Sequence, residues 1–312
     1  MHMSKSAGAN RFLLIKAWGC GFWSDTQDVL TKLILAELTQ REPIVYWGNN
    51  SLYSVSPEGN AFEEYFLPVS EYSVEDLLGK GFSIHPPFWN EEILLREDPW
   101  KYTRYMRDVE SSLKSTENIL VSDTHNYVED LLPWIGEGHP LHGRNALAVY
   151  REAVDKYLRT RPDIVAEIEE FSGRNFTAGP ILGIHLRASD KIREVENLHA
   201  INSLYEKEIN DFLKANPGGR LFLLTDSESY LSYYRRLYGE ILCHTDCKRT
   251  ASAIKGVHLM PYEEKRRKGI EVLKDTYLAA KCDYFLGNPH SNVTKAVNWL
   301  KHWDEDKIKM IF

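Results

Sequence analysis

Four polar residues follow a short apolar segment past the middle of the sequence. They are spaced as H-x-R-x-x-D-K and comprise His185, Arg187, Asp190 and Lys191. The apolar run at 181–184 is short and is preceded by Gly-Pro, which is typical of a buried strand rather than a helix. Ligands of open α/β sheets bind at the carboxyl ends of the strands. Two cations placed there, one of them an Arg that makes paired hydrogen bonds to oxygen atoms, would suit a phosphate group.

Polar residues also follow two later predicted strands. They are Thr225 and Asp226 after the strand 221–224, and Asn288, His290 and Ser291 after the strand 283–287. Ser291 precedes a predicted helix, and a helix N-terminus with a hydroxyl cap and a nearby Arg can hold a diphosphate. Taken singly, these positions are explained by solvated loop charges and a plain helix cap. Their convergence at one edge of a sheet favours a binding site.

The elements that would position these residues alternate regularly from residue 181 onward. We expect strands at 181–186, 221–224, 240–243 and 283–287, helices at 203–214, after 226, at 270–281 and at 292–302, and an edge strand at 307–312. Such alternation predicts an α/β fold with a doubly wound parallel sheet.

The first half begins with a predicted βαβ unit over residues 11–48. Its tight turn, 18–23, contains Gly19 and Gly21 but no third glycine, so the dinucleotide fingerprint G-x-G-x-x-G is absent. Ser24 or Asp25 can cap the helix that follows, and the turn's backbone N–H groups can still meet a phosphate or a sugar. A plain tight turn is the alternative.

The remaining first half divides into two regions. Residues 49–144 are irregular and rich in Pro, Trp and Tyr, whereas 145–172 have helical spacing broken at Arg161-Pro162. The length of 312 residues predicts two domains, which we place at 1–172 and 173–312.

Charge is distributed unevenly along the chain. The net charge is −7, but residues 1–178 hold 17 Lys+Arg against 27 Asp+Glu, whereas residues 179–312 hold 21 against 18. An acidic protein is not expected to bind nucleic acid, which requires phosphate neutralisation. A positive second half would suit an anionic ligand.

The sequence contains no apolar run of about 20 residues and no signal peptide, so no transmembrane segment is expected. Four scattered cysteines (Cys20, Cys243, Cys247 and Cys282) fit a reducing, cytoplasmic location. Cys243 and Cys247 flank a histidine but have no second ligand pair, so we expect no metal site there.

The second half resembles glycosyltransferase family 23, which includes the core fucosyltransferases and NodZ-like fucosyltransferases. Three motifs carry the resemblance, and the turn at 18–21 resembles the family's glycine-rich loop. The motifs are His185-x-Arg187-x-x-Asp190-Lys191 with His199 downstream, the strand ending in Thr225-Asp226, and Asp275 and Asp283 followed by Ser291. Together they cover most of 163–297.

The resemblance implies a GT-B-like fold with two Rossmann-like domains, the first facing the acceptor and the second binding a nucleotide-sugar. It implies an inverting, metal-independent transferase that moves fucose from GDP-fucose to a glycan hydroxyl, with no cofactor besides the donor. Arg187 would bind the diphosphate, and Asp275 would contact the base or ribose. The implied donor-binding residues are Gly19, Cys20, Gly21, His185, Lys191, Asp226, Asp275 and Ser291.

The acceptor hydroxyl requires a carboxylate base, and Glu194 and Glu196 flank the position of the family's base. Val195 occupies that position, and solvated loop carboxylates are the alternative for its two neighbours. Ala188 replaces a basic residue that family members usually have. A different GDP-sugar or other nucleotide-sugar donor, or a non-catalytic sugar- or nucleotide-binding protein, is therefore the alternative function.

Two further enzyme classes are disfavoured. A metal-dependent GT-A transferase needs a D-x-D motif, and Asp304-Glu305-Asp306 lies near the chain end in a sequence typical of a polar turn. A nicotinamide dehydrogenase would need the missing glycine fingerprint. The sequence leaves the acceptor and the oligomeric state open.

Overall fold

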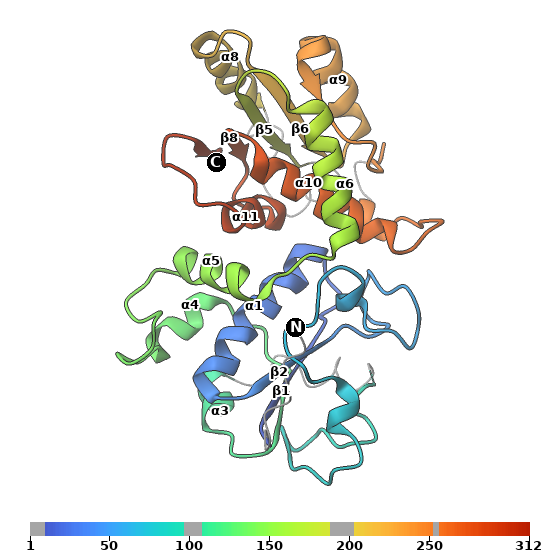
Figure 1. Ribbon diagram of the computed structural model, residues 1–312, viewed down its shortest axis with the longest axis vertical. Coiled ribbons are helices and arrows are strands. Elements are labelled where there is room, and N and C mark those ends of the chain that lie inside the picture. Colours follow the sequence, from blue (N-terminus) through green and yellow to red (C-terminus); the bar gives the residue numbers. More distant parts are fainter. Residues whose placement is uncertain (1–9, 97–107, 188–202, 252–255) are drawn as a thin grey trace. The chain divides into compact units, whose positions relative to one another are not determined.

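The computed structural model describes residues 10–96, 108–187, 203–251 and 256–312. The chain divides into two compact units, residues 1–161 and 162–312, and each contains its own parallel sheet (Figure 1). Two parallel α/β units confirm the expected GT-B-like fold class. None of the described helices is both long enough and apolar enough to cross a bilayer.

The sheet of the first unit has four parallel strands in the order β2-β1-β4-β3. The strands are β1 (Phe12–Lys16), β2 (Glu42–Tyr46), β3 (Ile84–His85) and β4 (Ile119–Ser122). β1, α1 (Phe22–Thr39) and β2 form the predicted βαβ unit. β3 and β4 lie in the segment that we described as irregular, because β4 is only four residues long and its parallel partner is distant in sequence.

The helices of the first unit lie mainly against one another and against α1. Besides α1, they are α3 (Val109–Lys114), α4 (Val128–Leu131), α5 (Ala146–Tyr157) and the short 3₁₀ helices η1 (Ala61–Glu64), η2 (Val74–Leu77) and η3 (Leu132–Trp134). α1 contacts β1, β2, α3, α4 and α5. Gly21 is its N-cap, so Ser24 and Asp25 lie inside the first turn rather than at the cap as expected.

The sheet of the second unit has five parallel strands in the order β7-β6-β5-β8-β9. The strands are β5 (Ile181–Leu186), β6 (Arg220–Thr225), β7 (Leu242–Cys243), β8 (Tyr284–Gly287) and β9 (Ile308–Met310). This topology confirms the predicted doubly wound sheet, with β9 as the expected edge strand. β7 is shorter than predicted, because residues 239–241 form a 3₁₀ turn. The order reverses beside β5, since β6 lies on one side of it and β8 on the other.

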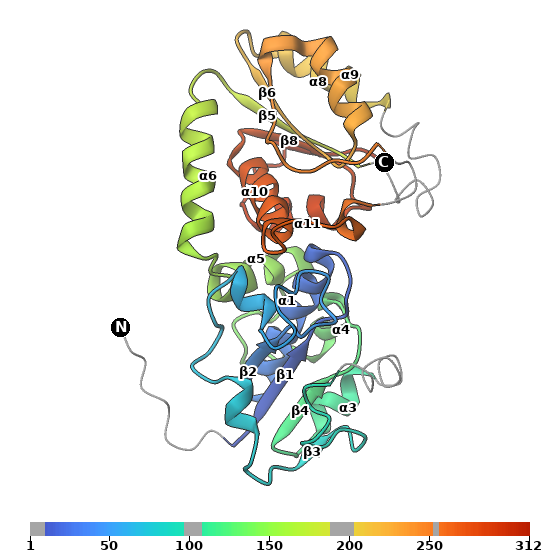
Figure 2. The ribbon, with the colours of Figure 1, turned by 90° about the vertical axis from the view of Figure 1, so that its right-hand side faces the viewer.

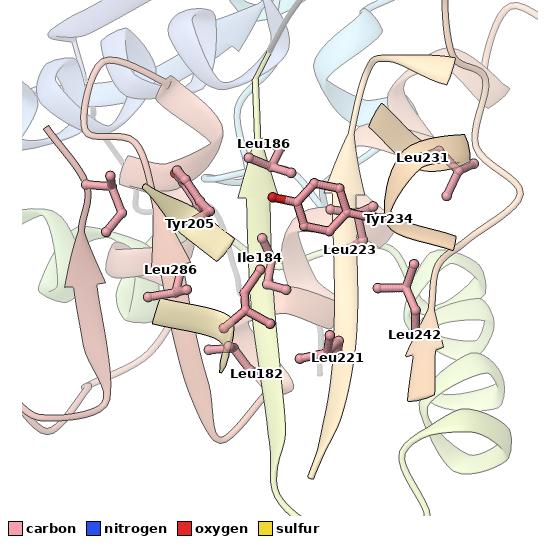
Figure 3. Packing of buried hydrophobic residues seen from close by; sticks show 12 residues of the cluster. Leu182, Ile184, Leu186, Tyr205, Leu221, Leu223, Leu231, Tyr234, Leu242 and Leu286 are labelled. Atoms are coloured by element: carbon pink, nitrogen blue, oxygen red, sulfur yellow. The ribbon is translucent and has the colours of Figure 1, made fainter. Parts of the chain in front are cut away.

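Helices cover both faces of this second sheet (Figure 2). They are α6 (Pro162–Asn175), α8 (Tyr205–Ala215), α9 (Glu228–Tyr238), α10 (Arg267–Lys281), α11 (Asn292–Trp299) and the 3₁₀ helices η5 (Gly239–Ile241) and η6 (Val257–Leu259). Leu182, Ile184 and Leu186 of β5 pack against Tyr205 of α8 and Leu231 of α9 (Figure 3). The residues between them along β5 face the opposite side, where α10 contacts the sheet.

The compact units divide after residue 161, so α6 lies in the second unit, whereas the sequence analysis expected a domain boundary at 172/173. Its Ile164 and Ile168 are buried, and it contacts α10. Ion pairs Asp163–Arg266 and Glu167–Arg267, each at 2.7 Å, link the two segments. With the boundary after residue 161, the second unit holds 22 Lys+Arg and 22 Asp+Glu, so it is neutral rather than positive.

Candidate active site

The Arg187 guanidinium is held at the carboxyl end of β5 by an ion pair with Asp226, which follows β6. Leu186 pairs with Thr225 in the parallel register, so the two charged residues leave the sheet side by side. Both side chains are mostly buried, 19% and 10% exposed respectively. The pair fixes a guanidinium at the sheet edge rather than leaving it in solvent.

Strand alternation places this pair on the side of α10 and α11. Leu182, Ile184 and Leu186 face α8 and α9, so His185 faces the other side, and Arg187 continues that alternation. His185 confirms the assignment because its Nδ1 lies 2.8 Å from the Thr294 hydroxyl of α11. The site residues predicted on these helices, Asp275 of α10 and Ser291 at the start of α11, therefore lie on the same side of the sheet as Arg187.

His185 is buried and holds β5 against α11. Burial, reinforced by the nearby Arg187 charge, lowers its pKa to about 3, so the ring is neutral at physiological pH. The backbone carbonyl of His185 accepts a hydrogen bond from the Tyr205 hydroxyl at 3.1 Å. The side chain therefore acts as a neutral hydrogen-bonding group and adds no positive charge to the site.

The turn between β8 and α11 brings two more polar groups to this edge. Ser291 is the N-cap of α11, but its side chain makes no capping hydrogen bond. Asn288 is 1% exposed, and its amide Nδ2 is buried without a hydrogen-bond partner among the described residues. An unpaired buried donor is costly, so it marks a position where a ligand oxygen would be stabilised. The helix N-terminus also favours an anion.

Asp275 of α10 is tied to the loop that follows β7. The Thr245 hydroxyl donates to Asp275 Oδ1 at 2.5 Å, and the Cys247 thiol lies 3.4 Å from the same oxygen. Arg249 closes the loop by donating to the carbonyls of residues 245 and 247. Burial raises the pKa of Asp275, and the hydrogen bond from Thr245 opposes that rise.

The glycine-rich turn expected to contact phosphate is filled by a side chain of its own unit. The Asp25 carboxylate accepts hydrogen bonds from the backbone N–H groups of Trp18 and Cys20. Burial raises the pKa of Asp25 to about 7, and the bond from the Cys20 amide opposes the rise. These two amides are thus not available to a phosphate. The roles expected for Gly19, Cys20 and Gly21 remain predictions that depend on other groups of the turn.

The backbone geometry of the turn requires glycine at position 19. Its φ is +73°, and a Cβ built there would lie 2.8 Å from the Asn50 carbonyl oxygen. Only glycine therefore fits this turn without displacing the backbone.

Several predicted site residues lie outside the described part of the chain. They are Asp190, Lys191, Glu194, Glu196 and His199 together with Ala188 and Val195. The alternative D-x-D residues lie in a polar turn before β9, as expected, with Asp304 paired to Lys307 at 2.8 Å. Among the described residues, no group of three or more His, Cys, Asp or Glu is arranged to hold a metal.

The sequence interpretation did not identify Thr245 or Thr294 and gave Asn288 no role. Thr245 meets a carboxylate 30 positions away, and Thr294 meets a histidine 109 positions away. No local pattern indicates such pairs. The sequence could have suggested a ligand-binding role for Asn288, because an amide directly after a buried strand lies where ligands bind.

No protein-family model matches the sequence, and a search of the curated proteins finds no match either. Solved structures do match. NodZ α-1,6-fucosyltransferase soaked with GDP-fucose has a TM-score of 0.62 and 21% identity over 93% of this chain and 92% of its own.

Two other solved structures are similar at lower identity. POFUT1 in complex with GDP-fucose has a TM-score of 0.57 and 11% identity over 99% of both chains. Arabidopsis thaliana FUT1 in complex with GDP has a TM-score of 0.57 and 12% identity over 93% of this chain and 68% of its own. The chain therefore has the fold of the NodZ-like fucosyltransferases.

Proposed function

We propose that this protein is an inverting, metal-independent glycosyltransferase that moves fucose from GDP-fucose to a glycan hydroxyl. The observation that carries the proposal is the Arg187 guanidinium, fixed by Asp226 at the carboxyl end of β5. It lies at the strand where the sheet order reverses, which is where open α/β sheets bind nucleotides. The similar structures of this fold that contain GDP-fucose or GDP support the choice of donor.

The diphosphate would be held by Arg187 and by the N-terminus of α11. The Ser291 hydroxyl makes no capping hydrogen bond, and the Asn288 Nδ2 has no hydrogen-bond partner among the described residues. Both groups would therefore donate hydrogen bonds to phosphate oxygens. The helix dipole adds a partial positive charge at the same point. When the glycosidic bond breaks, negative charge develops on the leaving GDP, and a preorganised guanidinium stabilises it without a metal.

The nucleoside would lie toward Asp275. Among the described residues, both bonds to this carboxylate fall on Oδ1, so Oδ2 is placed to accept an N–H from a purine base. Thr245 orients the carboxylate by its short hydrogen bond. An N–H donor on the ligand would also favour the charged form of a buried carboxylate.

The acceptor hydroxyl would lose its proton to Glu194 or Glu196, which follow the Arg187 motif in sequence. A base that acts on the acceptor while the nucleotide leaves from the opposite face of the sugar produces inversion. Lys191 would add a second cation near the diphosphate. The low number of scattered cysteines supports a cytoplasmic location.

The donor class is tested by the melting temperature of the whole protein with GDP, UDP or NAD. We expect GDP alone to raise it, because a ligand that binds only the folded state stabilises that state. Arg187→Ala should abolish the GDP shift. Arg235→Ala removes an exposed Arg of α9 and should leave the shift unchanged.

Turnover separates an enzyme from a binding protein. Wild-type protein should release GDP from GDP-fucose in EDTA, faster with an acceptor glycan, and Arg187→Ala should lower kcat by about 10²-fold or more. A rise in melting temperature with UDP instead of GDP would indicate another donor. A GDP shift without turnover under any condition would indicate a non-catalytic protein.

A further inference from the structure

A short loop of the second unit, residues 245–250, connects the two ends of the proposed donor site, and we call it the strap. At one end, the Thr250 N–H donates to the Asp226 carbonyl at 2.9 Å, so the strap is fastened to the turn that follows β6. At the other end, the Thr245 hydroxyl donates to Asp275 of α10 at 2.5 Å. The strap therefore joins the residue that fixes the phosphate-binding arginine to the carboxylate proposed to contact the nucleoside.

The middle of the strap is also held in place. The Lys248 backbone N–H donates to Glu271 Oε2 at 2.8 Å, and the Tyr262 hydroxyl donates to the same oxygen at 2.9 Å. The Lys248 ammonium donates to the Pro261 carbonyl at 2.6 Å. Because it is fixed at both ends and in the middle, the strap can present its side chains in a preorganised geometry.

Arg249 is folded back onto the strap by its own guanidinium. Its Nη1 donates to the Cys247 carbonyl at 2.7 Å, and its Nη2 donates to the Thr245 carbonyl at 3.1 Å. A guanidinium has more N–H groups than these two bonds use, and Arg249 Nε has no partner among the described residues. The strap thus fixes the position of this cation but leaves it with hydrogen-bond donors to offer.

The Arg249 charge acts on Asp275. Burial raises the pKa of Asp275, and the Thr245 hydrogen bond and the Arg249 charge oppose that rise. Both Arg249 and Asp275 are partly exposed, so neither residue is sealed from solvent. A group that only donates and a carboxylate that, when charged, only accepts are therefore held near each other at one end of the site.

This pair is complementary to guanine and not to adenine. Guanine presents a 6-oxo acceptor next to its N1–H and 2-amino donors, whereas adenine presents a 6-amino donor next to an N1 acceptor. With adenine, a donor would face the guanidinium and an acceptor would face the carboxylate. A site that hydrogen-bonds its ligand rejects an analogue that leaves the polar groups of the site unpaired.

We propose that Arg249 is a specificity-determining residue of the donor site, which donates to the 6-oxo group of guanine while Asp275 accepts from the N1–H and 2-amino groups. The inference rests on the function proposed above and deepens it. It assigns the choice of base to a residue outside every motif that the sequence analysis identified.

The test compares two nucleotides by calorimetry on the full chain. They are GDP and 2-aminopurine riboside 5′-diphosphate, which keeps the diphosphate and the 2-amino group but has no 6-oxo group. Wild type should bind GDP about tenfold tighter or more. Arg249→Met removes the guanidinium and keeps a long side chain. It should weaken GDP binding about tenfold or more and change the affinity for the 2-aminopurine nucleotide by no more than about twofold.

Thr245→Val tests the other half of the pair. It removes the hydroxyl that orients Asp275, so it should weaken both nucleotides, because both present a 2-amino group to the carboxylate. Arg235→Met is the matched control, since Arg235 is an exposed arginine of α9, and it should bind both nucleotides as the wild type does.

A purely structural role of Arg249 predicts a different pattern. If Arg249 only braces the strap, Arg249→Met should weaken both nucleotides equally, and that result would overturn the inference. Equal affinity of wild type for the two nucleotides would overturn it as well. Arg249→Gln, which keeps an N–H donor for the strap carbonyls but is shorter, should show the same selective loss of GDP. It decides the question if the melting temperature without nucleotide shows that Arg249→Met is unfolded.

Turnover separates this inference from the function on which it rests. If wild type transfers fucose from GDP-fucose but does not distinguish GDP from the 2-aminopurine nucleotide, the inference fails and the proposed function stands. If wild type prefers GDP through Arg249 but transfers no sugar, the proposed function fails and the inference stands.

Discussion

Two basic side chains near the end of β5 differ in charge. The Arg187 guanidinium forms an ion pair with Asp226 at the sheet edge. His185, two residues earlier and 4% exposed, has its positive form suppressed by burial and by the Arg187 charge. One residue thus offers a fixed cation to a diphosphate, while the other acts as a neutral connector to Thr294.

The neutral state of His185 predicts a pH dependence of stability. Its pKa is about 3 in the folded protein against an ordinary value of 6.5, so the unfolded chain binds more protons between these values. This contribution to stability is fully present above pH 6.5 and is lost as the pH falls. Between pH 6.5 and pH 5, it should lower the unfolding free energy of wild type by roughly 1.5 kcal/mol.

His185→Gln should lack this component in denaturant titrations at the two pH values, since an amide does not titrate. His290→Gln changes an exposed histidine of the same unit and should behave as the wild type does. An identical pH slope in wild type and His185→Gln would contradict the assignment of a neutral buried imidazole.

At the scale of elements, close approach between a strand end and a helix builds the second unit's site. A Cβ on Gly287, at the end of β8, would lie 2.6 Å from Thr294 Cγ2 and 2.8 Å from its hydroxyl oxygen. Thr294 is fully buried and β-branched, so it has little freedom to move away. The absence of a side chain at 287 lets α11 approach β5 closely enough for the His185–Thr294 contact.

Gly287→Ala should therefore displace α11 and destabilise the protein by about 1–3 kcal/mol, as overpacking of a core usually does. The GDP-induced melting shift should fall as well, because Ser291 and Asn288 move with the helix N-terminus. Gly173→Ala is the matched control, since a Cβ there meets nothing within 4 Å. It should be neutral or slightly stabilising, because Gly173 is an exposed position of helix α6. Equal melting temperatures for both variants would refute the steric argument.

Across the whole chain, each unit has its own sheet and its own buried core. The second unit is neutral as a whole, so attraction for a diphosphate would come from the local arrangement around Arg187 rather than from net charge. The first unit carries the excess of acid, with 16 Lys+Arg against 23 Asp+Glu. α6 completes the second unit, although the sequence analysis placed it in the first.

Two fragments test that boundary. Residues 162–312 should fold alone and show a GDP-induced melting shift if the donor proposal holds. Residues 173–312 lose the buried Ile164 and Ile168 and the ion pairs to α10, so they should unfold at a much lower temperature. Circular dichroism during heating measures the difference. Equal stability of the two fragments would return the boundary to 172/173.

The sequence alone identified the elements whose signals are local. The apolar run at 181–184 and the regular alternation after it predicted the parallel sheet, because strands and helices differ in length and hydrophobic period. The same reasoning placed Arg187, Asp226 and Ser291 at strand ends, since parallel strands end at one edge. Family resemblance then supplied the expected fold, which the similar structures confirm.

Only the tertiary structure decided which groups meet. Ser24 or Asp25 was expected to cap α1, but Asp25 accepts hydrogen bonds from the preceding turn, and Thr245 donates a hydrogen bond to Asp275. β4 joins β1 from a region without strong periodicity, and it brings Tyr127 to the same edge as Trp18. Except for the Asp25 contact, these contacts join residues far apart in sequence, and all of them depend on how one segment packs on another, so no pattern within one element encodes them.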